Sequence, residues 1–345
     1  MKMTLALVTC LLATASHAQT TNLIPELKFG DNTKLKVWGW AQGSHVENRL
    51  PRETDFSMLV LRQRLTVGNH WEAFLDLDLA QVDNDHGNWL REINASYYLD
   101  PDDGEADPQS WKLTVGRIFV AAGNVTPPPF LIETVNYPQS DHFSAYAWGL
   151  QVSGKWDGWN LSADVTGASG LTFDAPEALN FDRPEASLRL EKLSETWSLA
   201  GSLQLSADFQ RYSVDGSFTP NKQVTLRGAL YYEQLTDDTA SNHFGGYGLV
   251  AYRPAKWLEL HGMLDHSQAL PKTWVETTSG FTDSGEYYYE RTKKTSSNET
   301  HTTLTPGLRF FFGDNVTLTA DCVIPVDGED PMAKTSFGAR VQVRF

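Results

Sequence analysis

Apolar and polar residues alternate along most of this chain. The segment LSADVTG (161–167) places Leu161, Ala163 and Val165 on one side and polar residues on the other. Segments 224–233 and 316–324 repeat the same two-residue period. A period of two is typical of β-strands with one apolar and one polar face. One such segment is weak evidence, but its repetition predicts an all-β protein.

Turn residues divide the alternating runs into about sixteen expected strands. Most are close to the roughly 9–11 residues that a tilted strand needs to cross a bilayer. We expect strands at 35–46, 56–67, 71–80, 89–98, 111–119, 145–156, 159–166, 185–193, 196–206, 210–219, 224–233, 246–253, 257–267, 302–312, 316–324 and 335–345.

The connections between these strands alternate in length. Short turns follow even-numbered strands and longer loops follow most odd-numbered ones, with exceptions at 100–110 and 207–210. Short periplasmic turns and long extracellular loops are typical of outer-membrane barrels, and an even strand count places both termini at the periplasmic rim. The sequence therefore predicts a transmembrane antiparallel β-barrel of about sixteen strands.

Tryptophans are concentrated beside the short turns. Aromatic residues form girdles where a barrel meets the membrane interfaces. Five of these residues share the apolar register, whereas Trp257 does not, which leaves a bulge or a lumen position open there. The tryptophans concerned are Trp71, Trp111, Trp156, Trp159, Trp197 and Trp257.

The last strand, SFGARVQVRF (336–345), alternates to the end of the sequence. Its apolar face suits lipid, whereas Arg340 and Arg344 on the other face suit an aqueous lumen. All backbone groups must be paired in hydrocarbon, so we expect this strand to pair with the first and close the barrel. A terminal phenylalanine, Phe345, also resembles the signal read by the barrel insertion machinery of the outer membrane.

Composition and the N-terminal segment agree with this picture. Lys2, an apolar stretch and small residues at 16–18 predict a secretory signal peptide over 1–18, followed by a periplasmic lead-in (19–34) and the barrel (35–345). The formal net charge of −15 argues against nucleic acid as a partner. No cofactor or metal motif is present, although 83–88 and 100–107 are rich in acids that could hold calcium.

The registers place charged side chains in the lumen. Six basic residues gather on strands next to the closing seam, and four acidic residues follow on the adjoining strands, which predicts a field across the bore. The alternative is that these charges pair locally and stiffen the wall. The two groups are Lys36, Arg62, Arg64, Arg309, Arg340 and Arg344, and Glu72, Asp76, Asp78 and Glu92. Further lumen candidates are Lys112, Lys155, Arg189, Arg227, Asp164, Glu191, Asp215, Glu233, Glu259, Asp265 and Asp321.

The long connection 120–144 is rich in proline and has an apolar centre. We expect it to fold into the barrel and narrow it; the alternative is an external loop that packs on its neighbours or on an adjacent subunit. The residues expected at the constriction are Phe130, Leu131, Ile132, Glu133 and Asp141.

Two stretches resemble a known family. VLRQRLTVGNHWEAFLDLDLA (60–80), and LREINASYYLD with WKLTVGRIFVAAGNVTPPP (90–129), are similar to the phosphate-selective porins O and P. The resemblance implies a sixteen-stranded barrel, usually trimeric, that passes small solutes. It also matches Arg62 and Arg64 to the family's strand-two arginines and Asp76 and Asp78 to its strand-three acids. Because 120–144 has no lysine or arginine, phosphate selectivity is not carried over.

The predicted function is therefore passive diffusion of small hydrophilic solutes or ions, general or weakly selective, with no catalytic step. The expected surroundings are outer-membrane lipid and lipopolysaccharide, and the expected assembly is a homotrimer. One alternative is a barrel enzyme resembling a lipase, for which His261 and Asp265 share the lumen register. Another is a surface receptor or adhesin, since 267–301 is the longest loop.

Overall fold

The computed structural model describes residues 26–47, 55–79, 90–99, 111–122, 146–156, 158–167, 184–237, 239–281, 287–295, 299–327 and 335–345. Every regular element in this part of the chain is a β-strand. No helix of the described residues is long and apolar enough to cross a membrane. The predicted all-β architecture is confirmed.

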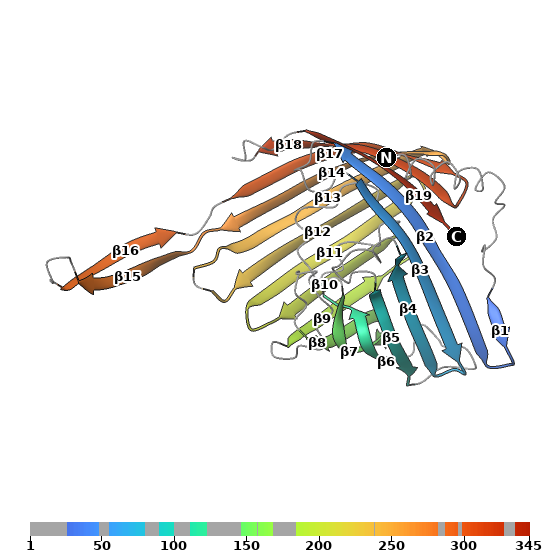
Figure 1. The fold of residues 1–345 in the computed structure, drawn as a ribbon. Helices are drawn as coiled ribbons and strands as arrows, with labels where there is room; N and C mark the ends of the chain where they lie inside the picture. The colour runs from blue at the N-terminus through green and yellow to red at the C-terminus, as the bar shows by residue number, and fades with distance from the viewer. Residues whose placement is uncertain are drawn as a thin grey trace.

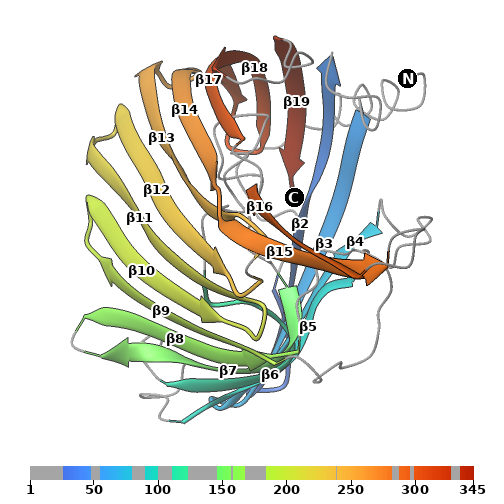
Figure 2. The ribbon, with the colours of Figure 1, turned by 90° about the vertical axis from the view of Figure 1, so that its left-hand side faces the viewer.

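Sixteen strands form one closed antiparallel wall (Figures 1 and 2). Each pairs with its neighbours in sequence, and β14 pairs directly with β17. The wall consists of β2 (Thr33–Glu47), β3 (Asp55–Val67), β4 (Trp71–Asp78), β5 (Leu90–Tyr98), β6 (Lys112–Phe119), β7 (Tyr146–Trp156), β8 (Trp159–Thr166), β9 (Glu185–Leu193), β10 (Trp197–Leu205), β11 (Phe209–Asn221), β12 (Val224–Leu235), β13 (Asn242–Ala255), β14 (Leu258–Leu270), β17 (Thr300–Phe312), β18 (Val316–Asp327) and β19 (Ser336–Arg344).

Three further strands lie outside the wall. The short β1 (Leu27–Phe29) pairs with the beginning of β2. Strands β15 (Thr273–Phe281) and β16 (Tyr287–Thr295) form a two-stranded sheet of their own, which projects from the barrel in Figure 1. Residues 271–272 separate β14 from β15 along the chain, and the described strands of this hairpin pair with each other rather than with the wall.

The barrel closes between its first and last long strands. Strand β19 pairs with β2 from Phe337↔Glu47 to Arg344↔Trp40. Gly39 and Phe345 then exchange two backbone hydrogen bonds, at 2.9 and 3.0 Å. A Cβ atom on Gly39 would clash with the carbonyl oxygen of Val60 and would lie 3.0 Å from the Phe345 ring. Glycine is therefore required at position 39, where β2 lies between Val60 of β3 and Phe345.

Burial is inverted relative to that of a water-soluble protein. Large apolar side chains are exposed on nearly every wall strand, Leu230 by 59% and Leu264 by 52%. The buried set is instead dominated by polar and charged side chains, including Asp76, Gln204 and Arg340. Exposed apolar area of this extent marks contact with an apolar environment. The wall has the two-sided character of a membrane barrel, apolar outside and polar inside.

Aromatic side chains cluster at the rim that carries the short turns 68–70, 194–196, 222–223, 256–257 and 313–315. We call this edge the short-turn rim. Trp71 packs edge-on against Tyr97, with ring centroids 4.9 Å apart. Trp257 stacks on Phe310 at 6.3 Å. The pairing of β13 and β14 shifts register between Tyr252 and Ala255, and this irregularity lets Trp257 join the outer face despite its place in the alternation.

Substitution of Leu264 by arginine tests the inverted wall. Leu264 lies at the centre of β14 and faces outward. We expect Leu264→Arg to lower the free energy of unfolding in lipid bilayers by about 2–4 kcal/mol, because a charge at the bilayer midplane loses its hydration. Urea unfolding in phospholipid vesicles measures this.

The matched control is Ser267→Arg on the same strand, at a position that faces the lumen. We expect a loss below about 1 kcal/mol there, because the introduced charge stays in water. Equal losses for the two variants would contradict the assignment of the two faces.

Candidate functional site

The lumen-facing surface is a continuous set of polar positions connected by the strand registers. Lys36 pairs with Arg64, Asp76 with both Arg62 and Glu92, and Arg309 with both Glu259 and Thr319. The same register extends around the wall. It places on the inner face all the charged positions expected there: Lys36, Arg62, Arg64, Lys112, Lys155, Arg189, Arg227, Arg309, Arg340, Arg344, Glu72, Asp76, Asp78, Glu92, Asp164, Glu191, Asp215, Glu233, Glu259, Asp265 and Asp321.

The basic residues near the seam share one arc. Thr319 on β18 pairs with Arg309 on one side and Arg340 on the other. Arg344 pairs with Trp40, and Lys36 and Arg64 follow on β2 and β3. The structure therefore brings the six basic positions onto β17, β19, β2 and β3, which together with β18 are consecutive strands of the wall.

Acidic residues on β4 form ion pairs with two arginines of this arc. Both Nε and Nη2 of Arg62 contact Oδ2 of Asp76, at 2.9 and 2.8 Å. Arg64 Nε lies 3.4 Å from Oε2 of Glu72. Asp78 accepts the backbone N–H of Leu59 at 3.1 Å. Because Asp76 is fully buried whereas the Arg64 side chain is 47% exposed, these neighbouring pairs differ in how strongly solvent screens them.

A buried aromatic cluster accompanies the arginines. Arg62 lies over the Trp40 ring at 4.8 Å, and Arg91 lies over the same ring at 5.6 Å. Arg91 also donates to the Tyr146 hydroxyl at 2.5 Å. Trp40 is on β2 and Arg91 on β5, with β3 and β4 between them, so the two side chains meet inside the bore.

The sequence reasoning missed Arg91. Strict alternation from Glu92 turns it toward lipid, but the pairing of β4 and β5 shifts register between Asp76 and Leu77. A bulge of this kind re-aims a side chain and leaves no clear mark in a hydrophobic pattern. Arg211, in contrast, shares the register of Asp215 and could have been found by extending the alternation.

A second set of ion pairs lies on the opposite wall. Arg189 contacts both carboxylate oxygens of Asp215, at 2.6 and 2.8 Å, and lies 3.4 Å from Glu191. Arg211 pairs with Glu233. Forked arginine–carboxylate contacts fix orientation as well as charge, so these pairs connect β9 to β11 across β10, and β11 to β12, on the lumen side.

After β6 the chain leaves the wall and enters the bore. The backbone N–H of Ala121 donates to Oδ2 of Asp164 on β8 at 2.6 Å. Strand β7 lies between β6 and β8, so residue 121 passes across the inner face of β7. Val120, Ala121 and Ala122 are all buried. The expected constriction residues Phe130, Leu131, Ile132, Glu133 and Asp141 lie outside the described residues.

The residues considered for catalysis lie on β14. His261 and Asp265 both face the lumen. The His261 ring packs over Gly307, where a Cβ atom would clash with Nε2. Within the described part of the chain neither ring nitrogen of His261 has a hydrogen bond. A nucleophile–histidine–acid arrangement requires such bonds on both sides of the ring, so this geometry does not supply one.

The described ranges contain no group of side chains suited to bind a metal ion. No group of three histidine, cysteine, aspartate or glutamate side chains there could hold a metal ion. The acid-rich segments 83–88 and 100–107 lie outside those ranges.

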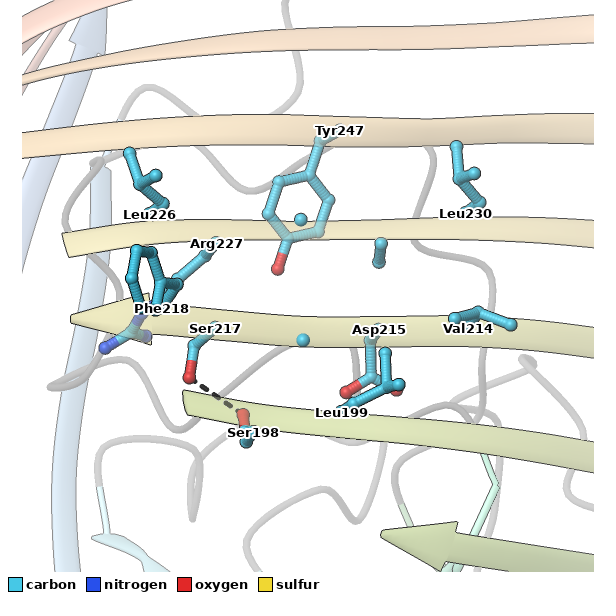
Figure 3. Close-up of a pocket in the computed structure, with 13 residues that line it drawn as sticks. Ser198, Leu199, Val214, Asp215, Ser217, Phe218, Leu226, Arg227, Leu230 and Tyr247 are labelled. Atoms are coloured by element: carbon cyan, nitrogen blue, oxygen red, sulfur yellow. Dashed lines mark hydrogen bonds between the residues drawn. The ribbon is translucent and has the colours of Figure 1, made fainter. Parts of the chain in front are cut away.

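A hollow of about 440 Å³ lies on the surface of the wall where three strands carry glycine at paired positions (Figure 3). Gly216 pairs with Gly228, and Gly228 pairs with Gly248. The apolar side chains around it are Leu199, Val214, Phe218, Leu226 and Leu230. All five belong to the exposed apolar face, so the hollow lies on the outer wall, and its lining also includes Asp215 and Arg227.

Comparison with known proteins identifies the fold. No protein-family model matches the sequence, and no curated protein matches it. Solved structures match in three dimensions. OmpT, an outer membrane protein of Vibrio cholerae folded in vitro, aligns with a TM-score of 0.61 over 93% of this chain and 100% of its own, at 10% identity. This chain has the porin fold.

Two further porin structures support the same conclusion. Salmonella typhi OmpF, solved in complex with Daunomycin, aligns with a TM-score of 0.60 over 93% of this chain and 100% of its own, at 12% identity. A triple mutant of the Rhodopseudomonas blastica porin gives a TM-score of 0.54 over 90% of this chain and 100% of its own, at 12% identity. The three-dimensional alignments establish the porin fold. At sequence identities this low they do not extend to the solute or the selectivity.

Removal of the Asp164 carboxylate tests whether its hydrogen bond to Ala121 keeps the segment after β6 in place inside the bore. A hydrogen bond to a charged group contributes about 1.5–3 kcal/mol, so Asp164→Ala should speed exchange of the Ala121 amide hydrogen by about tenfold or more. Hydrogen–deuterium exchange with mass spectrometry on detergent-solubilised protein measures it.

Asp164→Asn is the matched control, because the amide retains an oxygen that can accept the bond. We expect it to preserve more of the protection than the alanine variant. Unchanged exchange in Asp164→Ala would show that Ala121 is held by other contacts.

Proposed function

We propose that this protein is a passive diffusion channel of the bacterial outer membrane for small hydrophilic solutes or ions. The observation that carries the proposal is the inverted wall. Its lipid-facing side is apolar, whereas its lumen side carries ionised groups that require water or partners. A closed sheet of sixteen strands is of the size at which barrels enclose an aqueous channel.

Features at the ends of the chain support the location. The segment 1–18 has the composition of a secretory signal peptide. β2 begins and β19 ends at the short-turn rim, which is the periplasmic rim in barrels of this kind. The exposed apolar face supports outer-membrane lipid and lipopolysaccharide as the proposed surroundings.

The resemblance to phosphate-selective porins supports a particular placement of charged residues in the proposed channel. Arg62 and Arg64, followed by Asp76 and Asp78, match the order seen in phosphate-selective porins. The chain from 120 to 144 lacks lysine and arginine, so the proposal is a general or weakly selective channel. A homotrimer is the proposed assembly, supported by the trimer form of Vibrio cholerae OmpT.

A surface-recognition role is the second candidate, and one observation favours it. The β15–β16 hairpin projects away from the wall on the side opposite the short turns (Figure 1). Its sequence, TWVETTSGF and YYYERTKKT, combines aromatic and basic residues. This role is compatible with a channel, because the hairpin lies outside the barrel sheet.

Planar-bilayer recording tests the channel. We expect discrete conductance steps and a modest reversal potential under a salt gradient. Arg64→Glu should shift that potential toward cation preference, because an accessible positive charge in the lumen becomes negative beside Glu72.

Lys222→Glu, in the exposed β11–β12 turn, is the control for a charge change outside the bore. We expect little change in the reversal potential from it. Absence of conductance steps from folded protein would overturn the channel. An unchanged potential in Arg64→Glu would overturn only the role of this residue.

A further inference from the structure

Charged side chains of the lumen are sorted along the barrel axis. The lumen-facing positions nearest the short-turn rim are mainly basic on β2, β3, β6, β7, β12, β13, β17 and β19. They are Lys34, Lys36, Arg64, Lys112, Lys155, Arg227, Arg253, Arg309 and Arg344. The acidic positions at the same level are fewer: Glu72, Glu191 and Glu259.

Deeper along the same strands the balance reverses. The lumen-facing acids there outnumber the lysines and arginines at the same depth. The acids are Asp76, Asp78, Glu92, Asp164, Glu185, Asp215, Glu233, Asp265 and Asp321. The basic groups are Arg62, Arg91, Arg189, Arg211 and Arg340. The described lumen is thus positive toward one mouth and negative beyond it.

Local ion pairing preserves this separation. At the short-turn end Arg64 contacts Glu72 and Arg309 contacts Glu259, the latter at 2.7 Å. Each pair cancels one acid against one base, so the basic excess at this level remains. Deeper in the bore, Arg62–Asp76 and Arg211–Glu233 cancel in the same way and leave the acidic excess.

The two ends also differ in access to solvent. Lys36, Arg64 and Arg344 at the short-turn end are exposed. Asp76, Asp78 and Asp265 deeper in the wall are buried. A solute that enters from the short-turn side therefore meets accessible cations first.

We propose that the short-turn mouth of the lumen binds small polyvalent anions, and that the axial charge separation makes the open channel conduct unequally in its two directions. The inference rests on the proposed channel function. A water-filled bore with low-dielectric walls concentrates ions of the sign opposite to its lining. Two oppositely charged zones in series therefore accumulate ions under one polarity of voltage and deplete them under the other.

Salt concentration sets the scale of the effect. At 0.1 M ionic strength the screening length is about 10 Å, shorter than a strand of a dozen residues, so ions respond to the two zones separately. At 1 M the screening length falls to about 3 Å, and the field of each zone no longer reaches across a wide bore.

The test records single channels of the full-length mature protein in planar bilayers of known orientation. A Cys322→Ala background with Lys222→Cys in the β11–β12 turn provides one thiol at the short-turn rim. Biotinylation of that thiol and addition of streptavidin from one side report which way the channel faces.

We expect currents at opposite voltages to differ by about twofold in symmetric 0.1 M KCl and to become nearly equal in 1 M KCl. Citrate, the polyvalent anion used as the probe, should reduce the current at about fivefold lower concentration from the short-turn side than from the other side. Equal currents and equal citrate sensitivity from both sides would overturn the proposal.

Variants test whether the basic residues of the short-turn mouth cause the citrate asymmetry. Lys36, Lys112 and Lys155 changed together to glutamine should abolish most of the citrate asymmetry, and changed to glutamate should reverse it. Lys256→Glu, in the exposed β13–β14 turn at the same rim, is the control and should preserve both effects. Circular dichroism and heat-dependent gel mobility confirm that each variant is folded.

The outcomes distinguish the proposed channel function from the proposed asymmetry of conduction. Folded protein that produces no conductance steps overturns the channel and this inference together. Conductance steps with symmetric currents overturn the inference alone. Asymmetry that survives in the folded glutamate variant would place its origin outside the basic mouth.

Discussion

Backbone hydrogen bonding is the constraint on which this structure depends. A strand in hydrocarbon has no water to satisfy its N–H and C=O groups, so every strand edge must be paired. The pairing of β19 with β2 meets that condition, and the bonds between Gly39 and Phe345 extend it to the last residue. Once the sheet is closed, each strand has one face toward lipid and one toward the interior, and the period-two pattern follows.

The interior then determines the chemistry. Arginine, glutamate and aspartate can occupy alternate positions of a membrane strand only because the inner face is wet or paired. The arginines at the seam are supported by carboxylates on neighbouring strands and by aromatic faces, as in Arg62 between Asp76 and Trp40. Such contacts fix the guanidinium groups in place. The lumen is accordingly a set of oriented charges held by a rigid wall.

The sequence predicted the wall well because one simple period governs it. The sixteen expected strands correspond to the sixteen wall strands with differences of a few residues at their ends, and the inner and outer faces follow from parity. Local departures from that period could not be predicted from the sequence in the same way. Arg91 reaches the bore through a register shift, and Trp257 reaches the outer face through an irregular turn. Contacts such as Ala121 with Asp164 depend on the three-dimensional path of the chain, which alternation does not encode.

The seam between β2 and β19 has a consequence for the order of assembly. Its two partners stand at opposite ends of the sequence, so the loop that must close to join them is nearly the whole chain. Neighbouring hairpins can form from local contacts, but this joint carries the largest entropy of closure of any in the molecule. The edges of β2 and β19 therefore stay open longest during biogenesis, and in that interval they need shelter from other unpaired strands.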